Sequence, residues 1–587
     1  MPDTTRCQLS TINHQLNMLS EQEILRRQKR EELMKLGIDP YPAEEYPVNA
    51  TAADIHKNYE NNKLDYKGVT MAGRLMNFRI MGSASFAELQ DSTGTIQLYF
   101  RRDDLCPDDD KTLYNTVFKK LLDIGDIIGV RGFVFTTQTG EISVHVQEFK
   151  ILSKALRPLP VVKRDEEGNI YDGFTDPELR YRQRYVDLIV NPQVREVFRK
   201  RSRIITTMRG YFDDKGWLEV ETPVLQAIHG GAAARPFETH HNTLDMKLFL
   251  RIATELHLKR LIVGGFEGVY EFGKLFRNEG MDRTHNPEFT TVELYVAYKD
   301  YEWMMRMIEE LLEKVAVAVN GTSKTIFGET ELDFAGPYPR LSITDAIRQY
   351  TGLDVETLDE SAIREQCRTW GMKVDETMGK AKLIDEVFGE KVEEHIIQPT
   401  YIIDHPVEMS PLTKKHRSKA GAVERFELFV NGKEIANAYS ELNDPIDQKE
   451  RFEDQLKLKE RGDDEAMAMD DDFLRALEYG MPPTSGIGIG IDRLAMLLTN
   501  NSSIQEVIFF PQMRPEKKME VATDADYTAA GVPLVWIPAL QKMGFHTITL
   551  LRAANPNKVF NDLGGMRKKL KIDAPMPKKE EVEGWIS

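Results

Sequence analysis

The chain has 587 residues, 41% hydrophobic and 29% charged, which is typical of a globular protein of several domains and excludes a disordered or collagen-like chain. Lys and Arg number 77 and Asp and Glu 94, so the formal charge is −17 and nucleic acid can be bound only through local basic patches. Three cysteines without C-x-x-C spacing exclude a disulfide framework and predict a reducing, cytoplasmic location, while no apolar run predicts a signal peptide or a membrane helix.

Residues 1–60 are predicted to hold a leader and one amphipathic helix. Residues 1–17 are polar and are either a disordered leader or an extension before a start at Met18. Apolar and basic side chains follow a helical period over 21–36, and Gly37 ends that period. We favour a helix that packs one stripe on its neighbour over an arm that contacts phosphates.

Residues 61–155 change to a period of two. Five strands are predicted, in VTMAGRLMNFRI, SFAELQ, TIQLYF, DIIGVRGFVF and EISVHVQEF, with one helix in KTLYNTVFKKLL after the third. Five short strands and that single helix indicate an OB-fold barrel. Such barrels bind single-stranded nucleic acid by aromatic stacking on the second and third strands, where Phe86 and Gln97 lie beside Arg79.

A linker at 156–186, rich in Arg, Pro and Gly, leads to a large region at 187–515. Helices and strands mix there without a βαβ rhythm, so we expect an α+β fold with a mixed, mostly antiparallel sheet and flanking helices. A long helix is predicted before Gly216 and a strand interrupted by Pro223 after it. A helix-rich, peripheral stretch is expected at about 300–395.

Two glycine patterns are near misses for nucleotide-binding loops. GVYEFGKL at 268–275 has Leu where a P-loop needs Ser or Thr, and its glycines fall inside a strand-like run. SGIGIGIDR has G-x-G-x-G spacing, which is not the dinucleotide fingerprint. Its alternation suits either a strand with a glycine face that a flat ligand approaches or tight packing against a helix.

Charged side chains near these patterns suit the activation of a carboxylate by a nucleoside triphosphate. Arg277 and Arg493 can hold a carboxylate and phosphates through bidentate hydrogen bonds, and Phe289 can stack on adenine. Glu427 and Glu434 flank a hairpin-like Asn431-Gly432 turn, so they are expected to lie close together and could bind magnesium. Each residue alone is more often part of a surface ion pair.

Together these segments resemble the signature motifs of class II aminoacyl-tRNA synthetases. GWLEVETPVL resembles motif 1, FRNEG through HNPEF motif 2 and GIGIGIDR motif 3. With the barrel before them they resemble the subgroup that charges aspartate, asparagine or lysine. The segments that resemble the lysyl enzymes are GGAAARPFETHHN, ATELHLKRL, EFTTVELY and EIANAYSELND.

The resemblance implies a role for each matching residue. Arg277 would bridge the ATP α-phosphate and the amino-acid carboxylate, and Arg493 would hold the γ-phosphate. The remaining ATP contacts would be Glu279, His285, Asn286, Phe289, Glu434 and Gly490, with Mg²⁺ on Glu427 and Glu434. The lysine site would comprise Gly231, Glu255, Tyr295, Asn437, Tyr439 and Glu441. The anticodon of tRNA(Lys) would contact Arg79, Phe86, Gln97 and Glu141.

Lysine specificity also follows from the chemistry of the side chain. A cation on an apolar stem requires a carboxylate at the end of an aromatic slot, which Glu441 and Tyr439 supply. No cationic residue is expected at the end of the slot, because Lys259 and Arg260 follow on a helix. The alternatives are an aspartyl or asparaginyl enzyme of the same subgroup, or a regulatory paralogue that binds nucleic acid without charging it.

Residues 516–587 lie outside the resemblance and are predicted to form short helices. The segment 541–587 has nine Lys or Arg and five Asp or Glu, so 9 − 5 gives +4, in contrast to the acidic chain as a whole. This extension is either an auxiliary tRNA contact or an appendage that supports a dimer or has no such role. A homodimer is implied by the resemblance alone, since motif 1 forms the subunit interface in class II enzymes.

Overall fold

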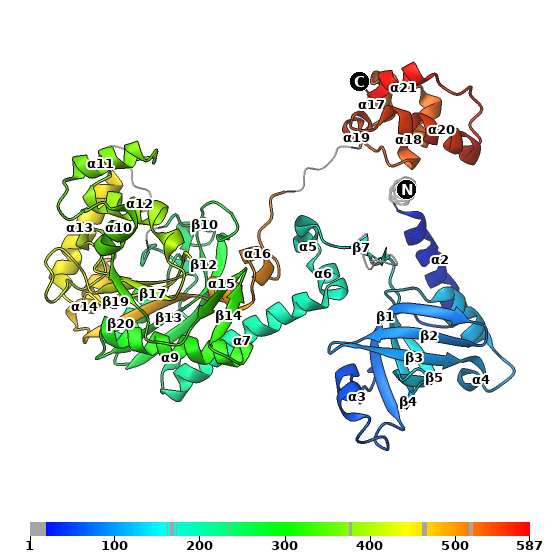
Figure 1. The fold of residues 1–587 in the computed structure, drawn as a ribbon, viewed down its shortest axis with the longest axis horizontal. Coiled ribbons are helices and arrows are strands. Elements are labelled where there is room, and N and C mark those ends of the chain that lie inside the picture. The colour runs from blue at the N-terminus through cyan, green and yellow to red at the C-terminus, as the bar shows by residue number, and fades with distance from the viewer. Residues whose placement is uncertain are drawn as a thin grey trace. The chain divides into compact units, whose positions relative to one another are not determined.

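The computed structural model describes residues 19–160, 163–164, 170–171, 173–232, 234–374, 378–460, 467–515 and 521–586. The predictions for residues 1–17 lie outside this described part. The chain divides into two units, Met1–Pro511 and Gln512–Ser587, and each is treated by itself below. Figure 1 labels their helices and strands.

The first domain is a closed five-stranded barrel, as predicted. Its strands are β1 (Val69–Met81), β2 (Ala84–Gln90), β3 (Thr95–Arg101), β4 (Ile127–Thr136) and β5 (Ile142–Ser153), in the order β1-β2-β3-β5-β4. The predicted helix is η1 (Leu113–Leu121), a π-helix. Alternate residues of β3, Ile96, Leu98 and Phe100, are buried in the barrel core, so the opposite face of that strand is left for binding.

The predicted N-terminal helix is α2 (Glu21–Lys35), and Ser20 and Glu23 form a capping box at its start. Arg26 is buried and donates to the backbone carbonyls of Ala155 and Ile124, at 3.1 and 2.9 Å. At least one basic residue of α2 is therefore buried against neighbouring segments, which supports the interpretation that this helix packs on its neighbour. A second short helix, α3 (Ala52–Asn58), lies before β1.

The large domain is built on an eight-stranded sheet with the order β16-β17-β18-β19-β20-β13-β12-β8. Only the β16–β17 and β12–β8 pairs are parallel, so the mixed, mostly antiparallel sheet is confirmed. The strands are β8 (Leu218–Glu219), β12 (Gly268–Phe276), β13 (Glu288–Ala297), β16 (Arg340–Ser342), β17 (Thr400–Ile403), β18 (Arg425–Val430), β19 (Lys433–Ser440) and β20 (Thr484–Gly490).

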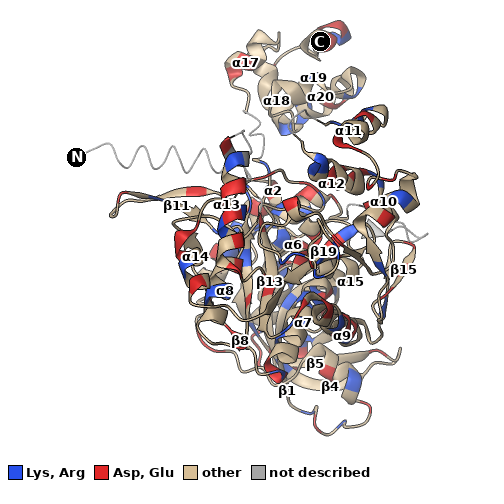
Figure 2. Ribbon diagram, turned by 90° about the vertical axis from the view of Figure 1, so that its left-hand side faces the viewer, with Lys and Arg blue, Asp and Glu red and all other residues tan. Residues whose placement is uncertain are grey.

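Helices flank this sheet, and the ribbon of Figure 2 marks acidic residues on α13 and α14. The long helix predicted before Gly216 is α7, and it packs with α9 and α15 into the main core. Helices α10 to α12 share a separate hydrophobic cluster. The helices are α5 (Pro177–Arg182), α6 (Arg184–Val190), α7 (Pro192–Asp214), α8 (Glu255–Val263), α9 (Tyr301–Asn320), α10 (Ile343–Thr351), α11 (Glu360–Thr369), α12 (Lys380–Lys391), α13 (Pro445–Glu460), α14 (Asp471–Glu478), α15 (Ile491–Leu498) and α16 (Ile504–Val507).

Three predictions about strands in this domain are confirmed. The run interrupted by Pro223 forms two short strands, β8 and β9 (Leu225–Gln226), and β9 pairs with a hairpin of β10 (Glu238–His241) and β11 (Met246–Leu250). GVYEFGKL lies entirely within β12, so its glycines form no phosphate loop. The glycine strand is β20, and α15 follows it directly.

The C-terminal unit is helical, as predicted, and has its own core. Tyr527, Trp536, Leu540, Leu563 and Trp585 are buried within it. Its helices are α17 (Asp524–Ala529), α18 (Ile537–Lys542), α19 (Ile548–Arg552), α20 (Pro556–Leu570) and α21 (Lys579–Ile586).

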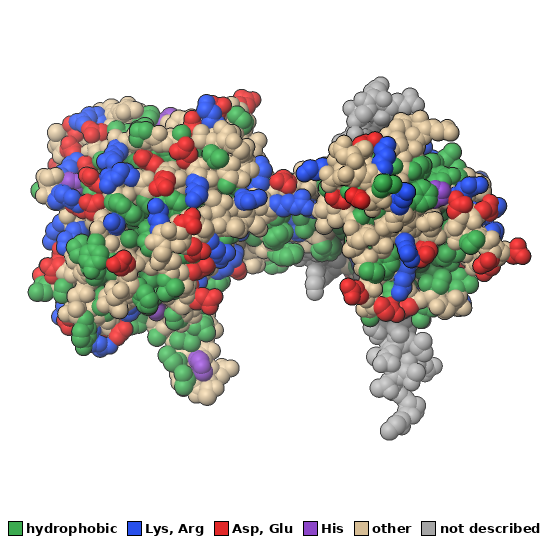
Figure 3. Space-filling model, turned by 90° about the horizontal axis from the view of Figure 1, so that it is seen from below, with side chains coloured by type: hydrophobic (Ala, Val, Ile, Leu, Met, Phe, Trp, Pro, Cys, Tyr) green, Lys and Arg blue, Asp and Glu red, His purple; other side chains and the backbone are tan. Residues whose placement is uncertain are grey.

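The surface mixes both signs of charge. On the face drawn in Figure 3, acidic and basic side chains are interspersed. Among the described residues, no helix has the length and apolar character required to cross a membrane. Cys106 and Cys367 are buried free thiols.

Candidate active site

A cavity of about 1780 Å³ opens on the face of the sheet formed by β13, β19 and β20. Every residue predicted for ATP, lysine or magnesium lines it except Glu441. These lining residues are Gly231, Glu255, Arg277, Glu279, His285, Asn286, Phe289, Tyr295, Glu427, Glu434, Asn437, Tyr439, Gly490 and Arg493. Residues separated by up to 262 positions thus share one cavity.

Arg277 and Phe289 face each other across the β12–β13 hairpin. Arg277 follows β12 directly, and its guanidinium carbon lies 5.2 Å from the centre of the Phe289 ring. Its Nε is buried and has no hydrogen-bond partner among the described residues. A buried donor without a partner is costly, so this guanidinium is well suited to an anionic ligand.

Arg493 lies in the first turn of α15 and is held from two sides. Its Nη1 donates to the backbone carbonyl of Glu434 at 2.7 Å, and its Nη2 lies 3.2 Å from His285 Nε2. His285 Nδ1 in turn lies 2.9 Å from an Asp282 carboxylate oxygen. This chain orients the second guanidinium toward the cavity, beside the N-terminus of a helix, which favours anions.

Glu427 and Glu434 are close together, as the hairpin predicted. Asn431 and Gly432 both have positive φ at the turn, and Asn437 lies opposite Glu427 on paired strands. The Asn437 amide donates to both carboxylates, at 3.1 and 3.3 Å. Burial raises the pKa of Glu427, and burial together with the charge of Glu427 raises the pKa of Glu434.

Glu393 is a further acidic residue here that sequence reasoning missed. Burial and the negative charges of Glu427 and Glu434 raise the pKa of Glu393 to about 7. Within the described residues, no cluster of three acidic, His or Cys ligands forms a ready metal site. Glu427 and Glu434 nevertheless supply carboxylate oxygens, which are the donors that a magnesium ion bound to phosphates requires.

The glycine strand separates two tyrosines at the other end of the cavity. Gly486 lies opposite Tyr295 on one side and Tyr439 on the other. A Cβ at Gly486 would come within 2.4 Å of the Tyr295 ring, whereas the nearest atoms to one at Gly488 or Gly490 would be 3.8 Å away. Tight packing therefore explains Gly486, and close approach of a ligand is open at Gly488 and Gly490.

Glu255, the first residue of α8, lines the same part of the cavity as Tyr439. Tyr439 donates its hydroxyl to Glu255 at 2.7 Å, and Gly231 packs against the Glu255 Cβ. Glu293, which sequence reasoning missed, accepts hydrogen bonds from Tyr295 and from the Thr254 amide. Burial, reinforced by the charge of Glu255, raises the pKa of Glu293 to about 7.

Glu441 lies behind the cavity lining and is paired with a cation. The fully buried ammonium of Lys259 contacts Glu441 and pairs with Glu255 at 2.5 Å. This corrects the expectation of a slot end without a cationic residue. The reason is helical geometry, since Lys259 is four residues after Glu255 and therefore lies on the same face of α8. That i, i+4 spacing was the available sequence signal.

The residues predicted to read an anticodon lie on the barrel, on β1, β2 and β3 and in the turn before β5. Arg79 pairs with Phe86 across β1 and β2, and Gln97 accepts a hydrogen bond from Ser143. Glu141 is exposed in the turn before β5. Phe86 belongs to an aromatic group that the sequence reasoning missed, although the alternation along β3, β4 and β5 could have indicated it. This group also contains Tyr99, Phe133, Phe135 and His145.

Comparison with known proteins agrees with this geometry. Residues 69–152 match the family described as OB-fold nucleic acid binding domain, and residues 176–514 match the family described as tRNA synthetases class II (D, K and N). A lysine–tRNA ligase of Porphyromonas gingivalis is 59% identical over 97% of this chain and 98% of that relative. The chain belongs to the lysine–tRNA ligase family.

Other relatives in this ligase family differ in how much of the chain they match. The ligase of Christiangramia forsetii is 63% identical over 86% of this chain and 88% of its own length. The ligase of Azobacteroides pseudotrichonymphae is 59% identical over 499 residues, 99% of its length. Nearly the whole of that relative is therefore matched, while 88 residues of this chain (587 − 499) lie outside the match.

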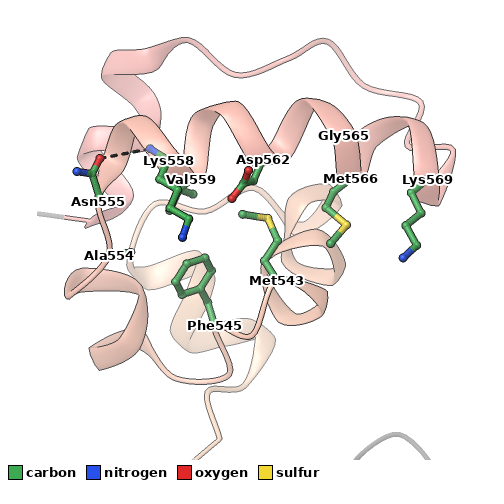
Figure 4. A pocket seen from close by; sticks show the side chains of 10 residues that line it. All are labelled: Met543, Phe545, Ala554, Asn555, Lys558, Val559, Asp562, Gly565, Met566 and Lys569. Carbon is green, nitrogen blue, oxygen red and sulfur yellow. Dashed lines mark hydrogen bonds between the residues drawn. The ribbon is translucent and has the colours of Figure 1, made fainter. Parts of the chain in front are cut away.

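The C-terminal unit, Gln512–Ser587, lies almost entirely after the class II family match, which ends at residue 514. It has a groove of about 720 Å³ between α20 and the segment around Phe545. Figure 4 shows Met543, Phe545 and Met566 forming its apolar part, with Lys558, Asp562 and Lys569 along α20. Asn555 caps α20 through the backbone amides of Asn557 and Lys558. The matches to the two families do not include the residues of this groove and assign no role to it.

Proposed function

We propose that the chain activates L-lysine with ATP to lysyl-adenylate and pyrophosphate, and then transfers lysine to the 3′ end of tRNA(Lys). The observation that carries this proposal is one cavity with two guanidinium groups at one end and a tyrosine-walled acidic slot at the other. A substrate with a carboxylate at one end and an ammonium at the other fits both ends. The family supports the same function.

In the first step the lysine carboxylate attacks the α-phosphorus of ATP, and the bond to pyrophosphate breaks. Arg277 would hold the attacking carboxylate and the α-phosphate together, while Phe289 stacks on adenine. Arg493, with His285 against it, would bind the γ-phosphate. The remaining ATP contacts are assigned to Glu279, Asn286 and Gly490. No general base is required, so alignment and charge neutralisation supply the catalysis.

Glu427 and Glu434 are the residues that would hold Mg²⁺. Burial raises both pKa values even though Arg425 lies 2.5 Å from Glu427 and Arg493 lies 3.8 Å from Glu434, so a further cation beside the pair would be favourable. A bound Mg²⁺ would neutralise phosphate charge. Asn437, which donates to both carboxylates, fixes their orientation and is assigned to the lysine carboxylate as well.

The lysine side chain would lie between Tyr295 and Tyr439, with its terminal ammonium toward Glu441. Its α-ammonium would bind at Gly231 and Glu255. In the second step a hydroxyl of the terminal tRNA ribose attacks the acyl carbon, and AMP leaves. The adenylate therefore stays enclosed between the two arginines and the slot until tRNA arrives.

The barrel is proposed to bind the anticodon of tRNA(Lys). Phe86 and Tyr99, with ring centres 5.2 Å apart, are half-buried on its outer surface and can stack on unpaired bases. Arg79 supplies a positive charge beside Phe86, and Gln97 and Glu141 supply polar groups for base edges.

The C-terminal unit is proposed to be an auxiliary contact for the tRNA backbone. Lys558, Lys568, Lys569 and Lys571 are exposed on and just after α20, in an otherwise acidic chain. A chain that ends at Pro515 should show a higher KM for tRNA, with a weaker dependence on salt concentration. An unchanged tRNA KM at every salt concentration would reject this role.

A homodimer is proposed from the motif 1 segment. Leu218, Val224, Leu225 and Ile228 are apolar and exposed there, which is typical of a surface that is buried on assembly. Sedimentation at twice the chain mass at micromolar concentration is expected, and sedimentation at the monomer mass would contradict it. A cytoplasmic location, where tRNA is charged, is proposed with the same activity.

ATP–pyrophosphate exchange with each of the twenty amino acids tests the proposed function, because it requires no tRNA. Exchange with lysine alone is expected. Exchange with aspartate or asparagine would favour the other members of the subgroup, and an absence of exchange with all twenty would favour a non-charging paralogue. The retained Arg277, Glu427, Glu434 and Arg493 argue against that last alternative.

A further inference from the structure

Lys259 lies behind the lining of the cavity, and no step of the proposed reaction uses it. Its side chain is fully buried, and its ammonium contacts both Glu255 and Glu441. Glu255 belongs to α8, whereas Glu441 follows β19. One buried ammonium thus joins carboxylates from two separate elements of the slot.

The other groups that face Lys259 are acidic or aromatic. The rings of Tyr439 and Phe473 have their centres 5.6 and 5.8 Å from the ammonium. Glu293, on β13, adds a third carboxylate, and its charge acts on Glu441. The hydroxyl of Tyr295 hydrogen-bonds to Glu293 at 3.2 Å. Beyond this shell, the charge of Arg425 on β18 acts on Tyr439.

The formal charges of the side chains in the slot are balanced only when the bound lysine substrate is included. Glu255, Glu441 and Lys259 together carry a formal charge of −1, and ionised Glu293 makes it −2. Lysine brings two ammonium groups, so the occupied slot is neutral apart from the substrate carboxylate, which the arginines bind. Uncompensated charge in a buried site is costly, so this balance favours a substrate with two ammonium groups.

Lys259 stays charged in this environment. Burial alone would lower its pKa, but the attraction of Glu255 and Glu441 outweighs burial, and the pKa of Lys259 lies above its usual value. Burial raises the pKa of Glu441, and the ammonium of Lys259 opposes that rise. Removal of Lys259 would leave the rise unopposed.

We propose that Lys259 is a positioning residue of the lysine slot, whose ammonium holds Glu255 and Glu441 in place before the substrate binds and opposes protonation of Glu441. This inference rests on the proposed function. Lys259 acts through the two carboxylates and does not touch the substrate. Without it, Glu441 would take up a proton more readily, and lysine would have to displace that proton on binding.

The test is the pH dependence of the KM for lysine in ATP–pyrophosphate exchange by Lys259→Met. At pH 7 the KM for lysine should rise by about tenfold or more, and this excess should shrink by about tenfold per pH unit for each proton released. The KM for ATP should stay unchanged. Lys259→Arg keeps the charge and should keep the pH profile of the parent protein, even where its absolute KM differs.

Lys154→Met is the matched control. Lys154 is also fully buried between two carboxylates, Asp123 and Asp126, but in the barrel. The same chemical change there should leave the KM for lysine and its pH profile unaltered. An excess KM in Lys259→Met that is equal at every pH, or that affects lysine and ATP alike, would overturn the proposal, since both indicate a purely structural role.

Lys259→Arg gives a second test in case Lys259→Met fails to fold. Because the guanidinium keeps a charge beside both carboxylates, the pH profile of its KM for lysine should match that of the unsubstituted protein. A pH profile that differs from that of the unsubstituted protein by one proton or more would overturn the proposal. No exchange with lysine at any pH would instead reject the proposed function.

Discussion

Two fully buried lysines, each between two carboxylates, show how one arrangement of charges can serve the fold or a site. Lys154 in the barrel bonds to Asp123 at 2.6 Å and to Asp126 at 2.8 Å. Asp126 also accepts the backbone amides of Asp123 and Ala155, and Lys29 bonds to the other oxygen of Asp123. All four carboxylate oxygens of the barrel group therefore have partners.

The group in the catalytic domain leaves bonding capacity unused. Oε1 of Glu441 accepts no hydrogen bond from any described residue, and Glu255 lines the cavity. The carboxylates of the barrel group are saturated by the protein itself, as is Glu255 in the slot, whereas Glu441 is not. Unused capacity beside a cavity, and not the buried ion pair itself, marks the group that is available to a ligand.

The largest effect is expected from Glu441→Gln. Loss of the charge that faces the substrate ammonium should reduce kcat/KM for lysine by about 100-fold, which corresponds to about 3 kcal/mol. Pyrophosphate exchange at varied lysine and ATP concentrations measures it. Glu424→Gln removes a buried, Arg417-paired carboxylate outside the cavity and should leave the KM for lysine unchanged. Equal effects of the two variants on the kcat/KM for lysine would show that Glu441 does not differ from a buried carboxylate outside the cavity.

Lys154→Met should give the opposite pattern. Removal of one partner of a buried ion pair costs about 3 kcal/mol of stability, because the carboxylates are left uncompensated. Amides of β4 and β5 should lose protection in hydrogen exchange by about that amount, while pyrophosphate exchange continues at the rate of the parent protein. A change in the KM for lysine would show that the barrel group is not purely structural.

Phe86→Ala tests the outer surface of the barrel, whereas Lys154→Met tests its interior. Loss of one stacking platform should raise the KM for tRNA(Lys) by about tenfold, since stacking contributes about 1 to 3 kcal/mol per base. Aminoacylation measures this effect, and pyrophosphate exchange should stay constant. Unaltered aminoacylation would remove the aromatic group from the proposed anticodon surface.

The smallest effect is expected from Glu293→Gln. In the parent protein the pKa of Glu293, raised to about 7 by burial, keeps this carboxyl protonated at lower pH. As the pH rises through 7, ionised Glu293 makes the slot more negative, so lysine should bind more tightly, by at most about tenfold per pH unit. The variant should lose this dependence between pH 6 and 8. A variant that keeps the full slope would place the titrating group elsewhere.

Local patterns in the sequence were sufficient for much of the fold. Alternation over β1 to β5 predicted the barrel strands, and the positive-φ Asn431-Gly432 turn placed Glu427 beside Glu434. Both features depend on residues that are close in sequence. The glycine strand was predicted for the same reason, since side chains alternate in direction along a strand.

Contacts between distant segments could not be predicted in this way. Lys259 and Glu441 are separated by 182 positions and meet only because α8 packs against β12 and β13, near the end of β19 where Glu441 lies. The aromatic group on the barrel likewise needs the register between β3 and β5 to bring Tyr99 and His145 together. The raised pKa of Glu393 depends on burial near a carboxylate pair that lies elsewhere in the chain.

The most direct test of the charge-selective slot compares lysine with norleucine, which has the same carbon stem and a hydrogen in place of the terminal ammonium. We expect pyrophosphate exchange to favour lysine over norleucine by about 1000-fold or more in kcat/KM, because norleucine leaves the buried Glu441 without its second cation. Comparable kcat/KM values for the two amino acids would contradict the account.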